Sequence, residues 1–228
     1  SVGWFAMILT AGSYVLTHYS SEARGYAPLM FFSLLAFIAM ERALATGKAK
    51  WDVVWNFAAI FGVLSHATFV TMLVSIGLWS VVTMLTSATS KGYVVLRLLR
   101  WHFIPVLFAG WLYWVNLSQV AIGGGIQQSP MGVVRDALSL TIGGPFENWV
   151  STVFAGIVAT SVMVCLIWLA VTRQKRYAFA FAMIIAIAPV GLVAFLGYSD
   201  LYVRFFLTSI LFVMLLFSLA LGRLYDAG

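Results

Sequence analysis

The sequence contains very little charge. Only 9% of its 228 residues are charged, with 13 Lys and Arg against 7 Asp and Glu, while 63% are hydrophobic. Soluble domains are about 25% charged and about 45–50% apolar, so this chain could not cover the surface of a water-soluble fold. The same composition excludes disordered, coiled-coil and collagen-like proteins, and a single cysteine, Cys165, excludes an intrachain disulfide. We therefore expect an integral membrane protein.

Long charge-free runs predict the helices. A helix needs about 20 predominantly apolar residues to cross a bilayer. The run 53–90 is 38 residues long, too long for one span, and we expect a helical hairpin that turns at Ser65-His66-Ala67-Thr68. Period-2 alternation is absent, so barrel strands are not expected. The predicted fold class is an all-α, polytopic transmembrane bundle of about eight helices, at residues 1–17, 26–45, 52–66, 68–86, 101–120, 148–171, 177–197 and 205–222.

The basic residues predict the topology. Ten of the 13 Lys and Arg fall on one predicted side, and Arg24, Arg135 and Arg204 fall on the other. Cytoplasmic loops are enriched in Lys and Arg, so we expect both termini in the cytoplasm. The basic surplus is therefore interpreted as a topology signal, and no nucleic-acid partner is expected.

The first residues of the sequence suggest how it relates to a longer chain. Ser1 lies inside an apolar run without a basic flank, which a cleaved signal peptide explains poorly. We expect one transmembrane domain, residues 1–228, that is part of a longer chain.

The longest predicted outer loop spans residues 121–147. Ser129-Pro130 is typical of a helix N-cap and first helical position, and Gly143-Gly144-Pro145 is typical of a helix end. Residues 131–142 between them are predicted to form a short amphipathic helix on the outer membrane surface. The alternative is a simple connector.

A second outer segment, residues 18–26, is unusually polar for its place between two apolar helices. Arg24 opens the second of these helices, a position suited to a bidentate grip on a phosphate. Glu22 could pair with Arg24, orient a hydroxyl or act as a base. The alternative is an interfacial ion pair with no further function.

The third outer segment contains Asp200 and Arg204. They are four residues apart, so they share a helical face and could pair. An arginine near the interface either extends towards the headgroups or binds an anion. Arg24 and Arg204 could therefore converge on one lipid phosphate.

The histidines suggest a metal site with an ordinary alternative. His18, Glu22 and His66 all fall on the outer side and could form a two-histidine, one-carboxylate site for a divalent metal. The alternative is that both histidines are interfacial and hydrogen-bonded to neighbours. His102 is expected at the opposite interface.

Three segments in order resemble one family. They are HYSSEARGYA at residues 18–27, LSHAT at 64–68 and DLYVRFFL at 200–207. Together they resemble segments of GT-C membrane glycosyltransferases, with the closer likeness to bacterial members similar to protein O-mannosyltransferases.

The resemblance implies an activity and a place in the cell. It implies a multi-pass enzyme of the bacterial cytoplasmic membrane that transfers a sugar from a polyprenyl-phosphate donor at the extracytoplasmic face. No other cofactor is implied. Glu22 becomes a candidate catalytic residue of the active site. The positions that it assigns to binding the lipid phosphate or substrate are Arg24, Arg204, His66, Tyr26 and Asp200.

One departure from the family leaves two interpretations. The family's acidic catalytic motif lies in its first outer loop, and this chain starts at what resembles the third helix, so no residue matches that motif. The chain is then either an N-terminally incomplete enzyme or a non-catalytic, accessory transmembrane subunit of a larger membrane complex. The expected partners are membrane lipids, the polyprenyl-phosphate sugar and other membrane subunits. A transporter is disfavoured, since the predicted spans contain almost no ionisable residues.

Overall fold

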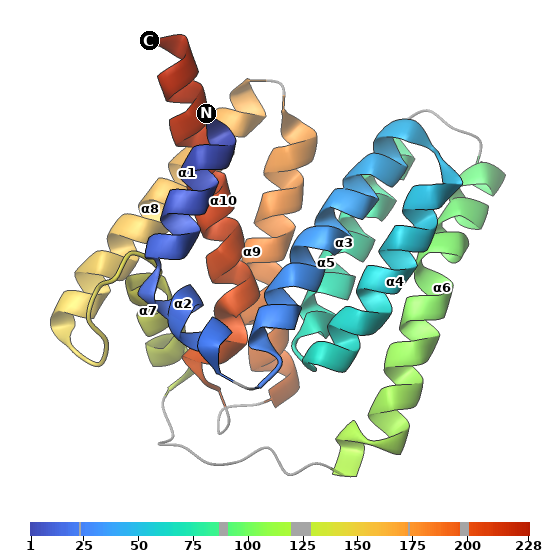
Figure 1. The fold of residues 1–228 in the computed structure, drawn as a ribbon, viewed down its shortest axis with the longest axis horizontal. Helices are drawn as coiled ribbons and strands as arrows, with labels where there is room; N and C mark the ends of the chain where they lie inside the picture. Colours follow the sequence, from blue (N-terminus) through green and yellow to red (C-terminus); the bar gives the residue numbers. More distant parts are fainter. Residues whose placement is uncertain (23, 87–90, 120–128, 173, 197–200) are drawn as a thin grey trace. The chain divides into compact units, whose positions relative to one another are not determined.

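A computed structural model describes residues 1–228 except 23, 87–90, 120–128, 173 and 197–200 (Figure 1). The described part is 88% helical and contains no strand. Five of its segments are long and apolar enough to cross a membrane: α3 (Tyr26–Thr46), α5 (Phe69–Thr86), α6 (Lys91–Val115), α8 (Trp149–Val171) and Val203–Ala227, which joins the short 3-10 helix η2 (Val203–Phe206) to α10 (Leu207–Ala227). The predicted class, an all-α protein embedded in a membrane, is confirmed at this level.

The chain forms two compact units. Unit 1 comprises Ser1–Arg24 and Gly124–Gly228, and unit 2 comprises Gly25–Gly123. Each unit has its own buried core and is described by itself. The single transmembrane domain within a longer chain stays a prediction.

Unit 2 consists of α3, α4 (Ala49–Ser65), α5, α6 and the short 3-10 helix η1 (Leu117–Gln119). α3 packs along α4, and α6 packs against α4 and α5. Small residues allow the first two helix backbones to approach closely, as in membrane helix pairs generally. The fully buried alanines of this interface are Ala36, Ala39, Ala58 and Ala59.

The predicted hairpin in the longest charge-free run is confirmed. α4 ends at Ser65, His66 has extended backbone angles, and α5 begins at Phe69. The turn is tight because Gly62 lies against the Phe69 ring, where no Cβ would fit. The polar turn at the centre of an apolar run therefore marked the end of one helix and the start of another.

Unit 1 is built around α10. In the most apolar stretch of Val203–Ala227, 72% of the residues are buried inside the protein. The other helices are α1 (Val2–Gly12), α2 (Tyr14–Ser21), α7 (Pro130–Thr141), α8 and α9 (Lys175–Leu196). α1, α7, α8 and α9 all pack on α10 (Figure 1). The Ser1 hydroxyl donates a hydrogen bond to Asp226 at 2.7 Å. The two ends of the chain therefore lie together, and their cytoplasmic location stays a prediction.

The prediction of one continuous helix over residues 1–17 is wrong. It is divided at Ser13, which has extended backbone angles and separates α1 from α2. The Ser13 hydroxyl accepts a hydrogen bond from the Leu16 N–H at 3.5 Å, as an N-cap does. This local hydrogen bond competes with a continuous helix. Counting apolar residues along the sequence does not detect it.

The start of the predicted fifth helix is also wrong, since α6 begins ten residues earlier, at Lys91 rather than Trp101. Charge limits how deep a residue lies in a bilayer but does not end a helix. The earlier start places Arg97 and Arg100 inside α6.

The helix predicted at residues 131–142 is confirmed as α7, Pro130–Thr141. Ser129 caps it by accepting a hydrogen bond from the Gly132 N–H at 3.1 Å. Its buried face is more polar than expected, because Asp136 and Ser139 are buried there beside Val133. Its place on the membrane surface stays a prediction.

Candidate functional site

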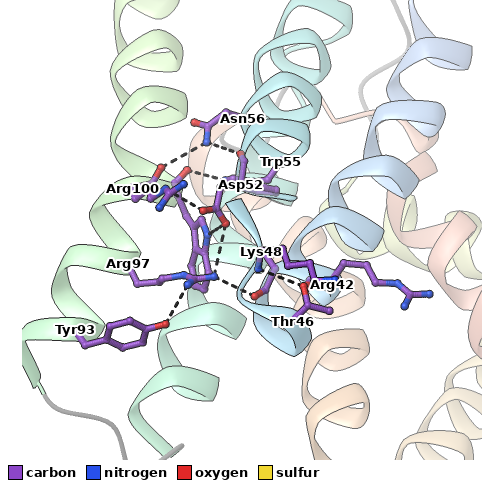
Figure 2. Close-up of polar contacts among 11 residues, drawn as sticks. Arg42, Thr46, Lys48, Asp52, Trp55, Asn56, Tyr93, Arg97 and Arg100 are labelled. Carbon is purple, nitrogen blue, oxygen red and sulfur yellow. Dashed lines mark hydrogen bonds and ion pairs between the residues drawn. The ribbon is translucent and has the colours of Figure 1, made fainter. Parts of the chain in front are cut away.

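The charged residues of unit 2 gather near three helix ends. They lie at the end of α3, at the start of α4 and in the first turns of α6: Glu41, Arg42, Lys48, Lys50, Asp52, Lys91, Arg97 and Arg100. Six are basic and two are acidic. Asp52 differs from the others because it is only 2% exposed. Its surroundings form the most developed polar cluster of this unit (Figure 2).

One hydrogen-bond donor and two guanidinium groups surround the Asp52 carboxylate. The Trp101 indole N–H donates to Oδ1 at 2.7 Å. Arg97 Nη2 lies 3.8 Å from Oδ1, and Arg100 Nε lies 2.9 Å from Oδ2. Hydrogen bonds to an ionised acceptor are stronger than neutral ones. The carboxylate therefore ties the start of α4 to one face of α6.

Neighbouring bonds hold the same helices in register. The Trp55 indole N–H donates to the Trp101 carbonyl at 2.7 Å, and Asn56 Nδ2 donates to the Arg100 carbonyl at 3.5 Å. Arg97 donates from Nη2 to the Ala43 carbonyl at 3.2 Å, which brings α3 into the cluster. We call Asp52, Arg97, Arg100 and Trp101 the Asp52 cluster.

The Asp52 cluster was missed in the sequence, where Arg97 and Arg100 were explained by topology alone. One signal was present. Asp52 is the only acidic residue between Glu41 and Asp136, and it begins an otherwise apolar helix, where an unpaired carboxylate is costly. Such a carboxylate is expected to pair with a cation. The sequence does not show which arginine is that partner.

The predicted pairing of Glu22 with Arg24 is confirmed in unit 1. Arg24 Nε lies 3.8 Å from Glu22 Oε2, and His18 Nε2 lies 3.5 Å from Oε1. Glu22 follows the last residue of α2, and its side chain is 29% exposed against 64% for Arg24. Oε2 is shielded from solvent and accepts no hydrogen bond from the described residues. We call these three residues the Glu22 cluster.

Tyr26 and His66 come together inside unit 2. Their ring centroids are 4.9 Å apart, and Tyr26 is buried. His66 Nδ1 is 2.8 Å from Thr68 Oγ1 and accepts a hydrogen bond from the Thr68 N–H at 3.3 Å. These bonds agree with the predicted hydrogen-bonded histidine and fix the ring against Tyr26.

Arg204 lies on aromatic rings. Its guanidinium carbon is 4.5 Å from the Tyr202 ring centroid and 5.6 Å from that of Phe205. No carboxylate in the described part of the chain pairs with it. Asp200, its predicted partner, lies outside the described residues. The convergence of Arg24 and Arg204 on one phosphate stays a prediction.

The third outer arginine, Arg135, is held by its neighbour on α7. Its Nη2 lies 2.8 Å from Asp136 Oδ1, and the same oxygen accepts a hydrogen bond from the Glu147 N–H at 3.3 Å. The hydrogen bond to Asp136 raises the pKa of the Arg135 guanidinium above its ordinary value. This pair links α7 to the segment before α8, a structural role for a charge that topology left unexplained.

The metal site predicted from His18, Glu22 and His66 draws on both units. Within the described ranges, no group of three or more His, Cys, Asp or Glu side chains could hold a metal ion. His102, predicted at an interface, hydrogen-bonds to Ser80 Oγ at 2.8 Å and contacts the Trp55 ring edge to face. It is therefore part of the packing between α5, α6 and α4.

Two polar groupings thus stand out for function. The Asp52 cluster is buried and ties helices together, while the Glu22 cluster presents an exposed guanidinium beside a partly shielded carboxylate. The second is the arrangement that could contact a substrate. The chain matches no protein family model, no curated protein and no solved structure.

Proposed function

We propose that this protein is the membrane part of a sugar transferase that uses a polyprenyl-phosphate sugar as donor. The proposal includes about eight membrane-associated helices, both termini in the cytoplasm and α7 on the outer surface of a bacterial cytoplasmic membrane. In the proposed reaction the bond from the sugar carbon C1 to the lipid phosphate breaks. A bond forms between C1 and an acceptor hydroxyl oxygen, whose proton goes to a base.

The Glu22 cluster is the observation that carries the proposal. The Arg24 side chain is 64% exposed and contacts Glu22 through Nε at 3.8 Å, so most of its surface is open to a ligand. A guanidinium in this state can grip phosphate oxygens bidentately. The cluster also falls in the longest of the three segments that resemble GT-C glycosyltransferases.

The other proposed residues have supporting roles. Arg204, stacked on Tyr202 and Phe205 without a described carboxylate partner, is free to hold the lipid phosphate. Tyr26 and His66 form a fixed aromatic pair that would line the substrate site. Asp200 keeps its proposed substrate role on the resemblance alone.

One observation favours the alternative of a non-catalytic, accessory subunit. Both Glu22 oxygens are already engaged, one by His18 and the other by Arg24. A general base must reach the proton that it removes, and contacts to His18 and Arg24 occupy both oxygens from which Glu22 would do so. No residue of this chain matches the family's acidic motif, so the base would lie elsewhere in the active assembly.

Replacing Arg24 by alanine should lower kcat/KM for sugar transfer about 10- to 100-fold, the value of losing a hydrogen bond to a charged group. The assay would measure transfer from a labelled polyprenyl-phosphate sugar by the full-length protein in membranes. Arg42→Ala is the matched control, because Arg42 is 59% exposed and contacts Glu41 through Nε at 3.6 Å. We expect the control to keep wild-type activity.

The outcomes separate the two functions. If Arg24→Ala and Arg42→Ala both transfer sugar at the wild-type rate, Arg24 does not hold the phosphate. If the full-length wild-type protein transfers no sugar but co-purifies with another membrane subunit that does, the accessory role replaces the enzymatic one.

A further inference from the structure

The charged helix ends of unit 2 keep an excess of positive charge after all of their ion pairs are counted. Glu41 pairs with Arg42, and Asp52 is shared by Arg97 and Arg100. Lys48, Lys50 and Lys91 have no carboxylate partner among the described residues. Part of this excess lies beside the Asp52 cluster.

Asp52 positions Arg100 and leaves most of its guanidinium available. The carboxylate contacts Nε at 2.9 Å, and the Arg100 side chain is 53% exposed. Neither Nη group donates a hydrogen bond to a described residue. The planar fork of two N–H-bearing nitrogens matches the geometry of phosphate oxygens. Arg100 is thus an ordered cation with its binding edge unused (Figure 2).

Lys48 is a second cationic residue near the Asp52 cluster. The Arg97 guanidinium, bonded to the Ala43 carbonyl, lies so close to Gly47 that a Cβ there would be 3.6 Å from Nη1. Lys48 follows Gly47, is exposed, and is the N-cap residue of α4, four residues before Asp52. Its flexible ammonium can therefore approach an anion beside the Asp52 cluster.

Exposed apolar side chains of α6 continue from this cationic site. Phe103 is 57% exposed, Ile104 is 54% exposed and Leu107 is 56% exposed. They follow Arg100 at positions i+3, i+4 and i+7, on one face of the charge-free part of a helix that is long and apolar enough to cross a membrane. A ligand that satisfies both features has an anionic phosphate at one end and hydrocarbon at the other. Inorganic phosphate would satisfy only the first.

We propose that Arg100 and Lys48 bind the phosphodiester of an anionic phospholipid, with Asp52 and Arg97 as positioning residues. The acyl chains would lie along Phe103, Ile104 and Leu107. This site involves none of the residues proposed for sugar transfer, and it stands or falls independently of that function. Basic pockets beside membrane helices recognise lipid headgroups in this manner.

Native mass spectrometry of the detergent-solubilised full-length protein would test the proposal. The probes are phosphatidylglycerol and phosphatidylcholine, each titrated alone and as an equimolar mixture. We expect preferential binding of phosphatidylglycerol that weakens as salt is raised. Lys48→Gln and Arg100→Gln should each weaken it about fivefold. Arg100→Lys should recover only part of the loss, because it restores the charge without the fork.

The controls distinguish a site from diffuse attraction. Lys50 is exposed but lies two residues from Asp52, on another face of α4, with its ammonium over the Trp51 ring at 5.2 Å. Arg42 extends away from the Asp52 cluster (Figure 2). We expect Lys50→Gln and Arg42→Gln to change phosphatidylglycerol binding less than about twofold, because screening weakens more distant charges.

Three results would overturn the proposal. The first is equal binding of phosphatidylglycerol and phosphatidylcholine. The second is an equal loss in Lys50→Gln and Lys48→Gln, which means that the surface charge acts diffusely. The third is displacement of phosphatidylglycerol by inorganic phosphate at matched ionic strength, which identifies a free anion as the ligand. Should Arg100→Gln fail to fold, Lys48→Gln carries the same test, since the Lys48 side chain makes no ion pair in the described structure.

Discussion

Replacing Asp52 by alanine should lower the free energy of unfolding by about 3–5 kcal/mol, the cost of removing one partner from a buried ion pair. The side chain of Arg97 is only 11% exposed and would lose its counter-ion. The indole N–H of fully buried Trp101 would lose its acceptor. Arg100 contributes less to the penalty, because its exposed guanidinium can turn to solvent. The measurement is reversible unfolding in mixed micelles, followed by tryptophan fluorescence.

Two variants sharpen this result. Asp226→Ala removes an exposed carboxylate that accepts a hydrogen bond from Ser1, and it should cost less than about 1 kcal/mol. Asp52→Asn keeps an acceptor for Trp101 but removes the charge, so its stability should fall between wild type and Asp52→Ala. If Asp52→Ala is as stable as Asp226→Ala, the cluster does not hold α4 to α6.

The hairpin shows what the sequence could predict. A 38-residue run without charge is too long for one span, and its most polar point, at His66 and Thr68, is where α4 ends and α5 begins. The α7 boundaries were predictable for the same reason, since Ser129-Pro130 combines a cap with a residue that suits the first helical turn. Length limits and local caps are properties of short segments, so these boundaries could be predicted, whereas the cap at Ser13 was missed.

The Asp52 cluster shows where sequence reasoning ends. Asp52 and Trp101 are distant in sequence and meet only because α4 and α6 pack together. Arg97 and Arg100 were interpreted by the side of the membrane on which they lie, a rule that says nothing about partners. The Glu22 cluster was predictable because its three members lie within one helical turn and the residues after it. Nearness in sequence, rather than chemical type, decided which polar cluster was found.

Replacing Gly25 by alanine should destabilise the protein through two separate effects. Gly25 precedes α3 with φ of 76°, in the left-handed region that costs other residues about 1–2 kcal/mol. A Cβ there would also collide with the Ser65 carbonyl oxygen. That oxygen belongs to the backbone at the end of α4, so no side-chain rotation relieves the contact. The strain would fall on the turn that places His66 against Tyr26.

Gly47→Ala is the matched control for this prediction. Gly47 follows the same helix, with φ of 68°, and a Cβ there would lie 3.6 Å from Arg97 Nη1, an ordinary contact. Both variants therefore share the cost of the left-handed conformation, and only Gly25→Ala adds the collision. The difference between their unfolding free energies should be about 1–3 kcal/mol, the range for overpacking. Equal destabilisation in the two variants would mean that α3 can move away from Ser65. The contact of Tyr26 with His66 would then not be fixed by this glycine.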